Sequence, residues 1–590
     1  MSTKLKVGIL FGGPSREREI SFRGGKTAFE HIDKSLYEPV LIFIDSLGNF
    51  IEINPELIYA DSIKDIYPSK NLNNGYRVYI ESLGDLNETQ LYKLIYKIGK
   101  QIKPEKLSER IDIAFPVMHG PYAEDGSIQG LLDWLGVPYV GPNMLASAIG
   151  IDKPFQNEIL KKSNGQKKKS KVILRAEWES ADRSALFSSL TKELGFPLVV
   201  KAPHQGSSIG VGIVRKRSME DFSKKMDQCF FNQIIQAKDW YKLTKRQKKN
   251  YLDKILDLSE GIGFPVVLNN KKLCHPTELL EALDTELTNK KQTKIISANA
   301  EEYVLIEEFI EGQEFSMGLI QDDNYNVFAL PPTEIYGEIE SFDFKSKYQS
   351  NITKKRIPID THIENLQKVE REGIQAFKDL GMNVVVRIDG FVTAKDEIIF
   401  HDPNTLPGMS PTSLIFKQMA EIGLDITDSI NYLIRQSIIQ RKLEGKRHFS
   451  YCQLLEKIDS NMLLSSKKER KKIAVVFGEN EEEYLTAQQK YNELSASEDY
   501  DPTCVCQAKN GNHYIIPINL MFKANIMDFG KAIATGQHPF VKSLIEKTAD
   551  IRRKYAGEVN FEVSKIEEAK LLSSFDFIYS CSKEELQETA

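Results

Sequence analysis

The segment VVVRIDGFVTAKDEIIFHDPNTLPG (Val384–Gly408) combines two β-rich runs with a polar turn between them. If the turn is the centre of a hairpin, Asp389 lies directly opposite Asp402. Arg387 then lies opposite Asn404, and all four side chains share one face of the sheet. Facing carboxylates destabilise a sheet unless a cation lies between them, and a few hard oxygen ligands suit Mg2+ bound to substrate phosphates. The alternative is a solvated edge hairpin with surface acids, which this segment alone slightly favours.

Length and composition indicate a soluble multidomain protein. The chain has 590 residues, too many for one hydrophobic core, so we expect three or four domains. Hydrophobic residues make up 41% and charged residues 27%, which is ordinary for a globular protein. The net charge of -5 and the lack of a basic stripe argue against a nucleic-acid partner. The short lysine clusters at 167–169 and 467–472 indicate solvated loops or linkers.

Cysteine usage and the first residues favour a reducing cytoplasm. Six cysteines are too few for a disulfide framework, and Cys504 and Cys506 form no CxxC zinc pair. The chain enters a buried-strand pattern without a signal peptide, and no apolar run reaches the length of a membrane span. We therefore expect a cytoplasmic protein without a membrane partner.

The N-terminal region predicts a parallel sheet. Apolar runs at Lys6–Phe11, Pro39–Asp45 and Ile111–Pro116 alternate with helical segments. Ligands of such sheets bind beyond the carboxyl ends of the strands, which is where Glu17 and His119 follow. The alternatives are a helix N-terminus that favours an acid at Glu17, and a structural histidine at His119. The spacing GxGxxG is absent, so nicotinamide binding is weakly supported.

A glycine-rich loop follows the strand expected at Leu198–Ala202. Lys201 emerges from that strand, and the loop to Gly212 offers backbone N–H groups, as phosphate sites do. An ordinary hairpin with a glycine turn explains this segment equally well. The acidic segment Glu307–Glu314 at the end of the next apolar strand offers groups for adenine and ribose, although an acidic turn is the simpler interpretation in isolation. We also expect helices at 147–162, 365–380 and 413–440.

After a charged linker, the chain repeats its own beginning in degenerate form. Lys472–Phe477 resembles Lys6–Phe11, and Tyr500 begins a run that resembles the one at Tyr37. The glycine-rich turn and the His-Gly turn are both lost from the repeat. We therefore expect a small α/β unit with a structural or partner role and no substrate, and we expect deletion of Ser465–Ala590 to leave the chemistry intact.

Six segments together allow a family to be recognised. They are Phe11–Ser21 (FGGPSREREIS), Phe115–Leu132 (FPVMHGPYAEDGSIQGLL), Val200–Val211 (VKAPHQGSSIGV), Val304–Phe315 (VLIEEFIEGQEF), Lys345–Tyr348 (KSKY) and Arg387–Ser413 (RIDGF…DPNTLPGMSPTS). On these segments, the chain from about Lys4 to Gln440 resembles the D-alanine–D-alanine ligases of the ATP-grasp superfamily. Their order along the chain is that of the family, so the resemblance is stronger than any single motif.

The resemblance implies a set of ligand-binding residues. The expected ATP ligands are Lys153 and Lys201 at the phosphates, Glu307 and Ile310 at the adenine, and Glu314 at the ribose. The expected metal ligands are Asp389, Asp402 and Asn404, which would hold two Mg2+ ions, with Mn2+ as an alternative. The expected partner is D-alanine, and the oligomeric state stays open, with a homodimer as one option.

The resemblance also implies a set of catalytic and substrate-binding residues. Glu17 would bind the ammonium of the first D-alanine, and His119 would lie close to its carboxylate. Ser207 and Tyr348 would join Glu17 in a hydrogen-bonded triad. Arg387 would stabilise the oxyanion of the tetrahedral intermediate, and Ser413 would hold the carboxylate of the second D-alanine. ATP would convert the first carboxylate into an acyl phosphate, which the second amine attacks. Retention of the tyrosine hydroxyl favours D-alanine over D-lactate as second substrate.

The sequence departs from the family pattern at two positions. Asp402 stands where the family usually has Glu, and Ala202 stands where it usually has Pro. An Asp side chain is still a competent hard ligand, so activity remains the favoured interpretation. Two other hypotheses stay open: a ligase for another amino or hydroxy acid, and a catalytically weakened ATP-binding scaffold.

These observations predict an α/β and α+β multidomain architecture. We expect a parallel-sheet preATP-grasp domain at 1–146 and an ATP-grasp central subdomain at 147–312, with an insertion of unknown purpose at about 217–300. We expect the ATP-grasp catalytic subdomain at 313–445, a linker at 446–470 and the degenerate repeat at 471–590. The expected product is D-alanyl-D-alanine for peptidoglycan synthesis.

Overall fold

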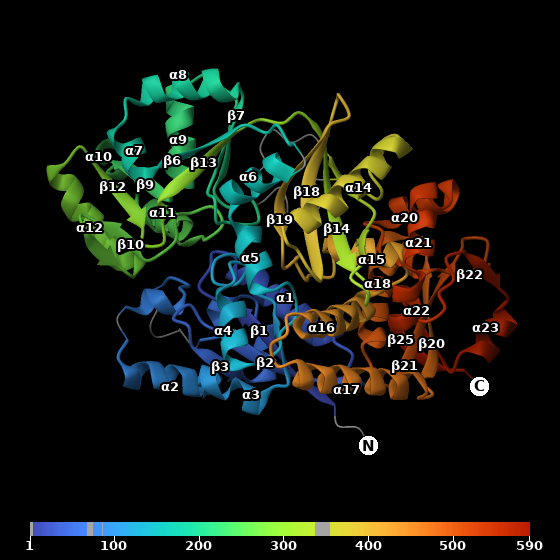
Figure 1. The fold of residues 1–590 in the computed structure, drawn as a ribbon. Coiled ribbons are helices and arrows are strands. Elements are labelled where there is room, and N and C mark those ends of the chain that lie inside the picture. The colour runs from blue at the N-terminus through green and yellow to red at the C-terminus, as the bar shows by residue number, and fades with distance from the viewer. Residues whose placement is uncertain (1–3, 68–74, 85, 164, 337–353, 590) are drawn as a thin grey trace.

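The computed structural model describes residues 4–67, 75–84, 86–163, 165–336 and 354–589. Within these ranges five β-sheets carry helices on their faces, and successive parts of the chain form successive units (Figure 1). The sheet formed by the predicted insertion is the exception, because it is nested within the sequence of another sheet. The architecture is the expected multidomain combination of α/β and α+β units.

The N-terminal unit has the sheet order β4-β3-β2-β1-β5. Its elements are β1 (Leu5–Gly12), α1 (Arg18–His31), β2 (Tyr37–Ile44), β3 (Phe50–Ile53), α2 (Glu88–Ile98), β4 (Gly99–Ile102), α3 (Leu107–Arg110), β5 (Ile113–Pro116) and α4 (Ser127–Leu135). β1 pairs in parallel with β2 and β5, as the apolar runs predicted. The antiparallel edge strands β3 and β4 were not predicted. Next to β5, Tyr139 forms a single β-bridge with Ala114.

The central unit has the sheet order β6-β13-β7-β8, with all neighbours antiparallel. Its elements are α5 (Met144–Ile151), α6 (Lys153–Ser163), β6 (Ser170–Leu174), α7 (Arg175–Ser180), α8 (Arg183–Leu194), β7 (Leu198–Lys201), β8 (Val211–Val214), α9 (Met219–Cys229) and β13 (Tyr303–Glu308). The helix expected at 147–162 is therefore two helices that are interrupted at Asp152. Phe222 and Met226 of α9 lie in the apolar core of this sheet, so the inserted segment begins only after α9.

The insertion forms a compact unit with the sheet order β11-β10-β12-β9. Its elements are β9 (Asn232–Gln236), α10 (Ala237–Trp240), α11 (Lys245–Leu256), β10 (Val266–Leu268), β11 (Lys271–Leu273), α12 (Pro276–Asn289) and β12 (Gln292–Ser297). Trp240, Leu252 and Leu279 lie in its apolar core, and Tyr76 and Val78 of the N-terminal unit join the same core. The insertion is thus packed against the N-terminal unit.

The hairpin unit contains the segment Val384–Gly408. Its elements are β14 (Gly312–Gln321), β15 (Val327–Ala329), β16 (Thr333–Tyr336), β17 (Lys354–Arg356), α14 (Ile363–Asp379), β18 (Val385–Thr393) and β19 (Ile398–Asn404), in the sheet order β17-β16-β14-β18-β19 with β15 on β14. Arg387 pairs with Asn404, as predicted. Asp389 pairs with His401, so the predicted pairing of Asp389 with Asp402 is wrong. The register shifts at a bulge, where Asp402 has a left-handed φ of 46° that turns its side chain out of the regular alternation.

Three helices follow the hairpin unit: α15 (Leu414–Glu421), α16 (Ile426–Leu443) and α17 (His448–Ser466). The helix expected at 413–440 is split because Gly423, with φ of 91°, ends α15. The linker expected at 446–470 consists mostly of α17, which packs along α16 and buries Tyr451 and Ile458. No helix within the ranges that the structure describes has both the length and the apolar character needed to cross a bilayer.

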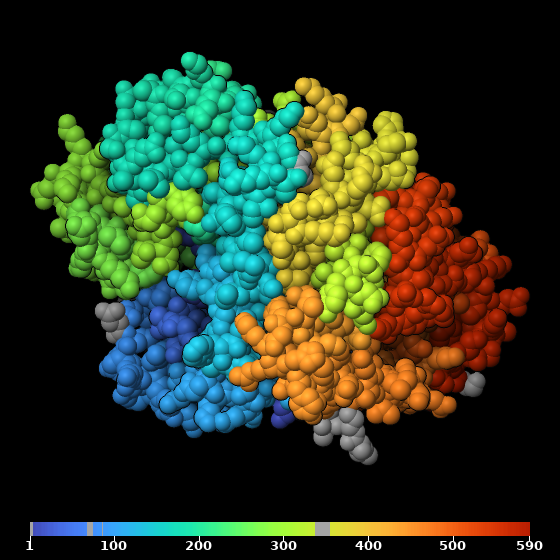
Figure 2. Space-filling view, viewed as in Figure 1, coloured from blue at the N-terminus to red at the C-terminus, as the bar shows by residue number. Residues whose placement is uncertain are grey.

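The C-terminal unit has the sheet order β23-β22-β21-β20-β24-β25. Its elements are β20 (Lys471–Gly478), α18 (Glu481–Ser495), β21 (Tyr500–Gln507), β22 (His513–Ile515), α19 (Ile518–Met521), α20 (Ile526–Thr535), α21 (Pro539–Lys547), α22 (Ala549–Tyr555), β23 (Ser564–Ile566), α23 (Glu568–Ser574), β24 (Phe577–Ser580) and β25 (Glu585–Glu588). In Figure 2 this unit, in red, lies directly against the yellow and orange segments. It is therefore part of the folded body of the protein.

His31, at the end of α1, predicts a pH-dependent stability. Its ring is buried, its Nδ1–H donates to the carbonyl of Asn492 on α18, and burial lowers its pKa from 6.5 to about 4. The folded protein thus binds this proton less readily than the unfolded chain. The contribution to stability is complete above pH 6.5 and is lost as the pH falls toward 4, by on the order of 3 kcal/mol.

The test is urea unfolding of the full chain across this pH range. We expect His31→Asn, which keeps a donor near Nδ1 but does not titrate, to lose less stability on acidification than the unmodified chain. The control is His448→Asn, because His448 is exposed on α17. An equal acid sensitivity of His31→Asn and the unmodified chain would contradict this assignment.

Candidate active site

The loop between β1 and α1 meets the glycine-rich loop between β7 and β8. Ser207 Oγ donates a 2.5 Å hydrogen bond to Glu17 Oε1. Ser15 Oγ donates to the carbonyl of His119 at 2.6 Å, so the turn after β5 belongs to the same cluster. Glu17 begins α1 without capping it through its side chain, which rules out the capping alternative. The structure thus brings together three predicted site residues from two units: Glu17, His119 and Ser207.

The carboxylate of Glu17 is enclosed by two glycines. A Cβ atom at Gly206 would lie 2.7 Å from Glu17 Oε2, and one at Gly120 would lie 2.8 Å from the same atom. Gly120 also has φ of 73°, which other residues rarely adopt. Glycine at both positions therefore makes room for a buried carboxylate. Burial, and then the nearby charge of Glu124, raise the pKa of Glu17.

Two side-chain atoms in this cluster lack partners among the residues that the structure describes. Glu17 Oε2 and His119 Nε2 are buried and make no hydrogen bond there. His119 Nδ1 lies 4.0 Å from Glu124, and burial lowers the pKa of the imidazole. Unpaired buried polar atoms are unfavourable, so a cluster that keeps an acceptor and a ring nitrogen free fits a polar ligand.

Arg16, which the sequence analysis did not select, anchors this loop in the insertion. Its guanidinium donates to the carbonyl of Ile262 at 2.6 Å and to Ser297 Oγ at 3.1 Å. Its Cζ lies 3.6 Å from the ring centroid of Phe231. Burial lowers the pKa of Arg16 to about 9, while Glu301 raises it. The insertion therefore holds the residue that directly precedes Glu17.

Glu301, at the end of the insertion, also reaches the glycine-rich loop. His204 Nδ1 lies 2.9 Å from one oxygen of Glu301, and Gln205 Nε2 donates to the other at 2.8 Å. Lys153 Nζ donates to the carbonyl of Gln205 at 2.8 Å from the other side. The loop that carries Ser207 is therefore fixed by the insertion and by α6.

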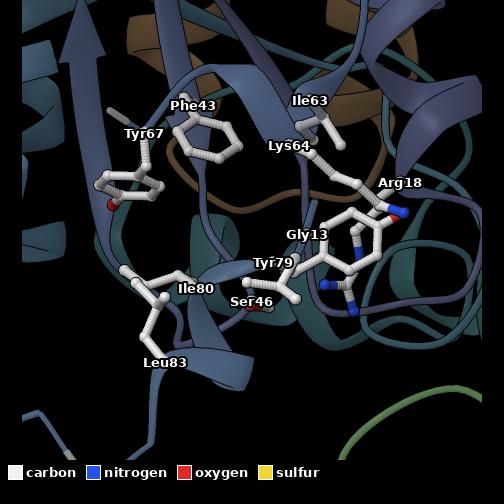
Figure 3. A pocket seen from close by; sticks show the side chains of 11 residues that line it. Gly13, Arg18, Phe43, Ser46, Ile63, Lys64, Tyr67, Tyr79, Ile80 and Leu83 are labelled. Atoms are coloured by element: carbon white, nitrogen blue, oxygen red, sulfur yellow. The ribbon is translucent and has the colours of Figure 1, made fainter. Parts of the chain in front are cut away.

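A small cavity of about 20 Å³ lies behind the Glu17 loop (Figure 3). Arg18 lies at its wall with Tyr79 nearby, and the guanidinium carbon is 4.6 Å from the ring centroid of Tyr79. Arg18 also pairs with Glu81 at 2.5 Å and donates to the carbonyl of Pro14. Such a volume holds about one water, so these residues support the loop rather than bind a substrate.

A second cluster joins the expected phosphate and adenine residues. Glu307 is buried between Lys168 at 2.5 Å and Lys201 at 3.0 Å. Burial alone would raise the pKa of Glu307, but Lys168 and Lys201 lower it to about 2. The structure therefore places the carboxylate of Glu307 between two lysines. Lys168 had been assigned to a solvated loop, and this was wrong because the pairing of β6 with β13 buries it beside Glu307.

Asp402 belongs to this lysine cluster. Its carboxylate lies 3.3 Å from Lys201, 3.9 Å from Lys153 and 3.0 Å from His401 Nδ1. Burial would raise the pKa of Asp402, but Lys201 and Lys153 hold it well below its usual range. The negative charge of Asp402 is therefore stabilised next to the lysines that would meet ATP phosphates.

Asp389 is buried on β18, and Asn404 is the last residue of β19. Asp389 Oδ1 accepts from Ser316 Oγ at 2.6 Å and lies 3.5 Å from Arg387 Nε. Asn404 Nδ2 donates to the carbonyl of Asp402 at 2.9 Å. Among the described residues no three His, Cys, Asp or Glu side chains form a metal-holding group. Mg2+ typically uses one or two carboxylates with substrate phosphates, so the donor chemistry of this hairpin still fits that ion.

Three of the remaining predicted residues lie within the described ranges, and one lies outside them. Ile310 and Glu314 are partly exposed at the end of β13 and the start of β14. Ser413 is the N-cap of α15, and its Oγ is 2.9 Å from Ser410 Oγ. Tyr348, with the KSKY segment, lies outside the residues that the structure describes.

Comparison with known proteins identifies the family. The family model described as D-ala D-ala ligase N-terminus matches residues 6–142, and the model described as D-ala D-ala ligase C-terminus matches residues 159–234 and 229–435. The D-alanine--D-alanine ligase of Natranaerobius thermophilus is 28% identical over 456 residues, covering 76% of this chain and 99% of that protein.

Two further proteins are similar to this chain over most of its length. The D-alanine--D-alanine ligase of Bacillus cytotoxicus is 25% identical over 448 residues, covering 75% of this chain and 98% of that protein. The solved D-alanine-D-alanine ligase from Coxiella burnetii aligns with a TM-score of 0.49 at 21% identity, covering 76% of this chain and 100% of that one. The two family models together span the chain from β1 into α16. The chain therefore belongs to the D-alanine–D-alanine ligase family of ATP-dependent ligases.

Proposed function

We propose that this chain joins two D-alanines in the cytoplasm to form D-alanyl-D-alanine, which enters peptidoglycan synthesis, and that the clustered residues perform the steps below. Family membership supports the reaction. The observation that supports the substrate assignment is the buried Glu17 carboxylate, whose Oε2 has no hydrogen-bond partner among the described residues. A coupled ADP-release assay with D-alanine tests the proposal, and pure protein without D-alanine-dependent turnover would contradict it.

The first D-alanine is assigned to the Glu17 cluster. Its ammonium would meet Glu17 Oε2, and the attraction would offset the burial that raises the pKa of Glu17. His119 Nε2 is the nearby free ring nitrogen for the substrate carboxylate. Ser207 holds the other oxygen of Glu17 and so fixes the orientation of the carboxylate. Tyr348 is proposed to complete the triad.

ATP is assigned to the lysine cluster and the adjoining strands. Lys153 and Lys201 would meet the phosphates, in place of part of their present contact with Asp402. Glu307 keeps Lys201 charged and positioned. Ile310, between β13 and β14, and Glu314, in β14, are proposed for the adenine and the ribose.

The bond-forming steps follow from these positions. The carboxylate of the first D-alanine attacks the γ-phosphorus of ATP, and ADP leaves. The amine of the second D-alanine attacks the resulting acyl carbon, phosphate departs with the bonding electrons, and the amine loses a proton. Arg387, held by Asp389, is proposed to face the oxyanion that develops. Ser413, at the N-terminus of α15, is proposed for the carboxylate of the second D-alanine.

Mg2+ is assigned to Asp389, Asp402 and Asn404, where it would neutralise phosphoryl charge once bound. The oxygen donors of these three residues suit this ion. Ser316 orients Asp389, and the bulge at Asp402 directs that carboxylate toward the phosphate-binding lysines. Asp402 is therefore proposed to bind an ion that in turn contacts the phosphates, despite its short side chain.

Gly206→Ala tests the enclosure of Glu17. The added methyl group would lie 2.7 Å from Glu17 Oε2 and displace either the carboxylate or Ser207. We expect kcat/KM for D-alanine to fall by about 100-fold, the scale of a small displacement at a reacting site. The control is Gly530→Ala, which has no atom within 4 Å of its new Cβ and should keep full activity. Equal kinetics of the two variants would refute the assignment.

The position of Asp402 at the bulge predicts that kcat and the Mg2+ requirement depend on its negative charge. We expect Asp402→Asn to lose about 100-fold in kcat and to require more Mg2+ for half-maximal rate, because one anionic ligand is gone. Asp402→Glu should keep measurable turnover. The control is Asp396→Asn at the hairpin turn, where the carboxylate accepts from Asn365. An Asp402→Asn enzyme with unchanged Mg2+ dependence would exclude Asp402 as a ligand.

Arg16 predicts a role for the insertion in binding the first substrate. Arg16→Ala would leave the carbonyl of Ile262 and Ser297 Oγ without their donor and free the Glu17 loop. We expect the KM of the first D-alanine to rise by about tenfold, roughly 1.4 kcal/mol, with a smaller change in kcat. Arg23→Ala, at an exposed position on α1, is the control. A lower melting temperature with unchanged KM would show that Arg16 serves stability alone.

A further inference from the structure

The C-terminal unit copies the strand pairings of the N-terminal unit residue by residue. The parallel register of β1 with β2 begins at Leu5 and Tyr37, and that of β20 with β21 begins at Lys471 and Tyr500. Each register runs for eight residue pairs. These pairings align Leu5 with Lys471 and Tyr37 with Tyr500.

Side-chain and turn contacts repeat in the same alignment. Lys6 N–H donates to Asp112 Oδ2 at 2.7 Å, and the aligned Lys472 N–H donates to Asp576 Oδ2 at 2.7 Å. The antiparallel pair Phe43 with Ile51 corresponds to Cys506 with Tyr514. One backbone plan therefore underlies both units, although few of the side chains agree.

The two units meet through equivalent surfaces. Lys4 Nζ lies 3.0 Å from Glu498 Oε2, and Arg470 Nη2 donates to Ser35 Oγ at 3.2 Å. Lys4 and Arg470 each directly precede the aligned first strands, and Ser35 and Glu498 each lie two residues before the aligned second strands. The first contact is therefore the counterpart of the second with the two units exchanged.

Such reciprocity is the signature of an interface with two-fold symmetry. In a symmetric dimer, residue i of one copy contacts residue j of the other, and residue j contacts residue i. Here the same relation holds within one chain. The backbone supports it, because Lys34 N–H, just after α1, donates to the carbonyl of Ala496, just after α18, at 3.3 Å. The aligned helices α1 and α18 thus meet at the same ends.

The N-terminal and C-terminal units share a continuous apolar core. Ile32 at the end of α1, Ile430 of α16 and Tyr484 of α18 are buried in one hydrophobic cluster. The first turn of α16 lies at the junction, where Thr427 donates to the carbonyl of His31 and Tyr491 donates to Asp425. If α1 were uncovered, this apolar face would be exposed to water.

The C-terminal unit also reaches the unit that carries the catalytic hairpin. Lys523 pairs with Glu421 at the end of α15, and Lys547 Nζ lies 2.6 Å from Glu370 on α14. Lys554 pairs with Asp323 after β14. One body therefore contacts both the unit that carries Glu17 and the unit that carries Arg387. That deletion of Ser465–Ala590 leaves the chemistry intact stays a prediction, and this packing shows that such a deletion would uncover surfaces of both units.

The copy has lost the site itself. Glu17, at the start of α1, accepts a hydrogen bond from Ser207 in the central unit. Asn480, at the start of α18, instead caps its own helix by accepting from Glu483 N–H. Glu483 in turn accepts from Gly478 N–H at 2.7 Å. The polar groups of the turn after β20 thus bond to one another, and the C-terminal unit retains the surface that packs against the N-terminal unit but not the site.

We propose that the C-terminal unit is an internal substitute for a second copy of this chain. It covers the face of α1 through which two N-terminal units would otherwise pair, and an approximate two-fold axis relates it to the N-terminal unit. The protein is then a monomer, and its C-terminal unit takes the place of a partner subunit without being able to dissociate, because it belongs to the same chain. This excludes a homodimer formed through α1.

The first test uses the full chain. Light scattering from low to high micromolar concentration should give the mass of one chain. In the double variant Lys34→Cys with Ala496→Cys, the adjacent backbones should allow a disulfide within one chain under mild oxidation, with D-alanine-dependent turnover retained. Each single variant controls for the six native cysteines. A stable dimer, or a disulfide that joins two chains, would overturn the proposal.

The second test opens the interface. Ala496 is fully buried beside α1, so Ala496→Arg should separate the two units and expose the α1 face, and the chain should then associate into dimers. The matched control is Ala534→Arg, at an exposed position of α20 in the same unit, which should stay monomeric. A folded Ala496→Arg chain that remains monomeric would refute a pairing face on α1. Should this variant fail to fold, the disulfide experiment decides the question.

Discussion

The hydrogen bond from Ser207 to Glu17 is the contact on which the organisation of the site depends. It joins the N-terminal unit to the glycine-rich loop of the central unit, and Gly120 and Gly206 leave the space for it. A buried carboxylate without such a partner would be strongly unfavourable. Much of the surrounding structure can be understood as support for this contact: Arg16 and Arg18 fix the loop on one side, and Glu301 and Lys153 fix it on the other.

Charge differs between the Glu17 cluster and the lysine cluster. Around Glu17 burial dominates, and the pKa of both Glu17 and Glu124 is raised. Around Glu307 the lysines dominate, and the pKa of the carboxyl is lowered to about 2. The first environment suits a ligand that brings a positive charge, and the second holds its lysines for a ligand that brings negative charge. This contrast matches an amino acid and a nucleotide.

The two segments that sequence alone left without a purpose both lie against the site-bearing units. The insertion contributes the carbonyl of Ile262 and the hydroxyl of Ser297 to Arg16, and its apolar core takes in Tyr76. The C-terminal unit packs on α1 and pairs with Glu421. Each extra segment thus buries apolar surface against a unit of the ligase core, so both restrict how those units move relative to one another.

Sequence by itself determined the local elements and the family. The apolar runs of β1, β2 and β5 and the pairing of Arg387 with Asn404 followed from period and turn position, because these depend on neighbouring residues. Only the tertiary structure decided that Lys168 is buried beside Glu307, that Arg16 anchors in the insertion, and that Asp402 leaves the hairpin register at a bulge. Those outcomes depend on strands and loops far apart in the chain, whose pairing no local pattern encodes.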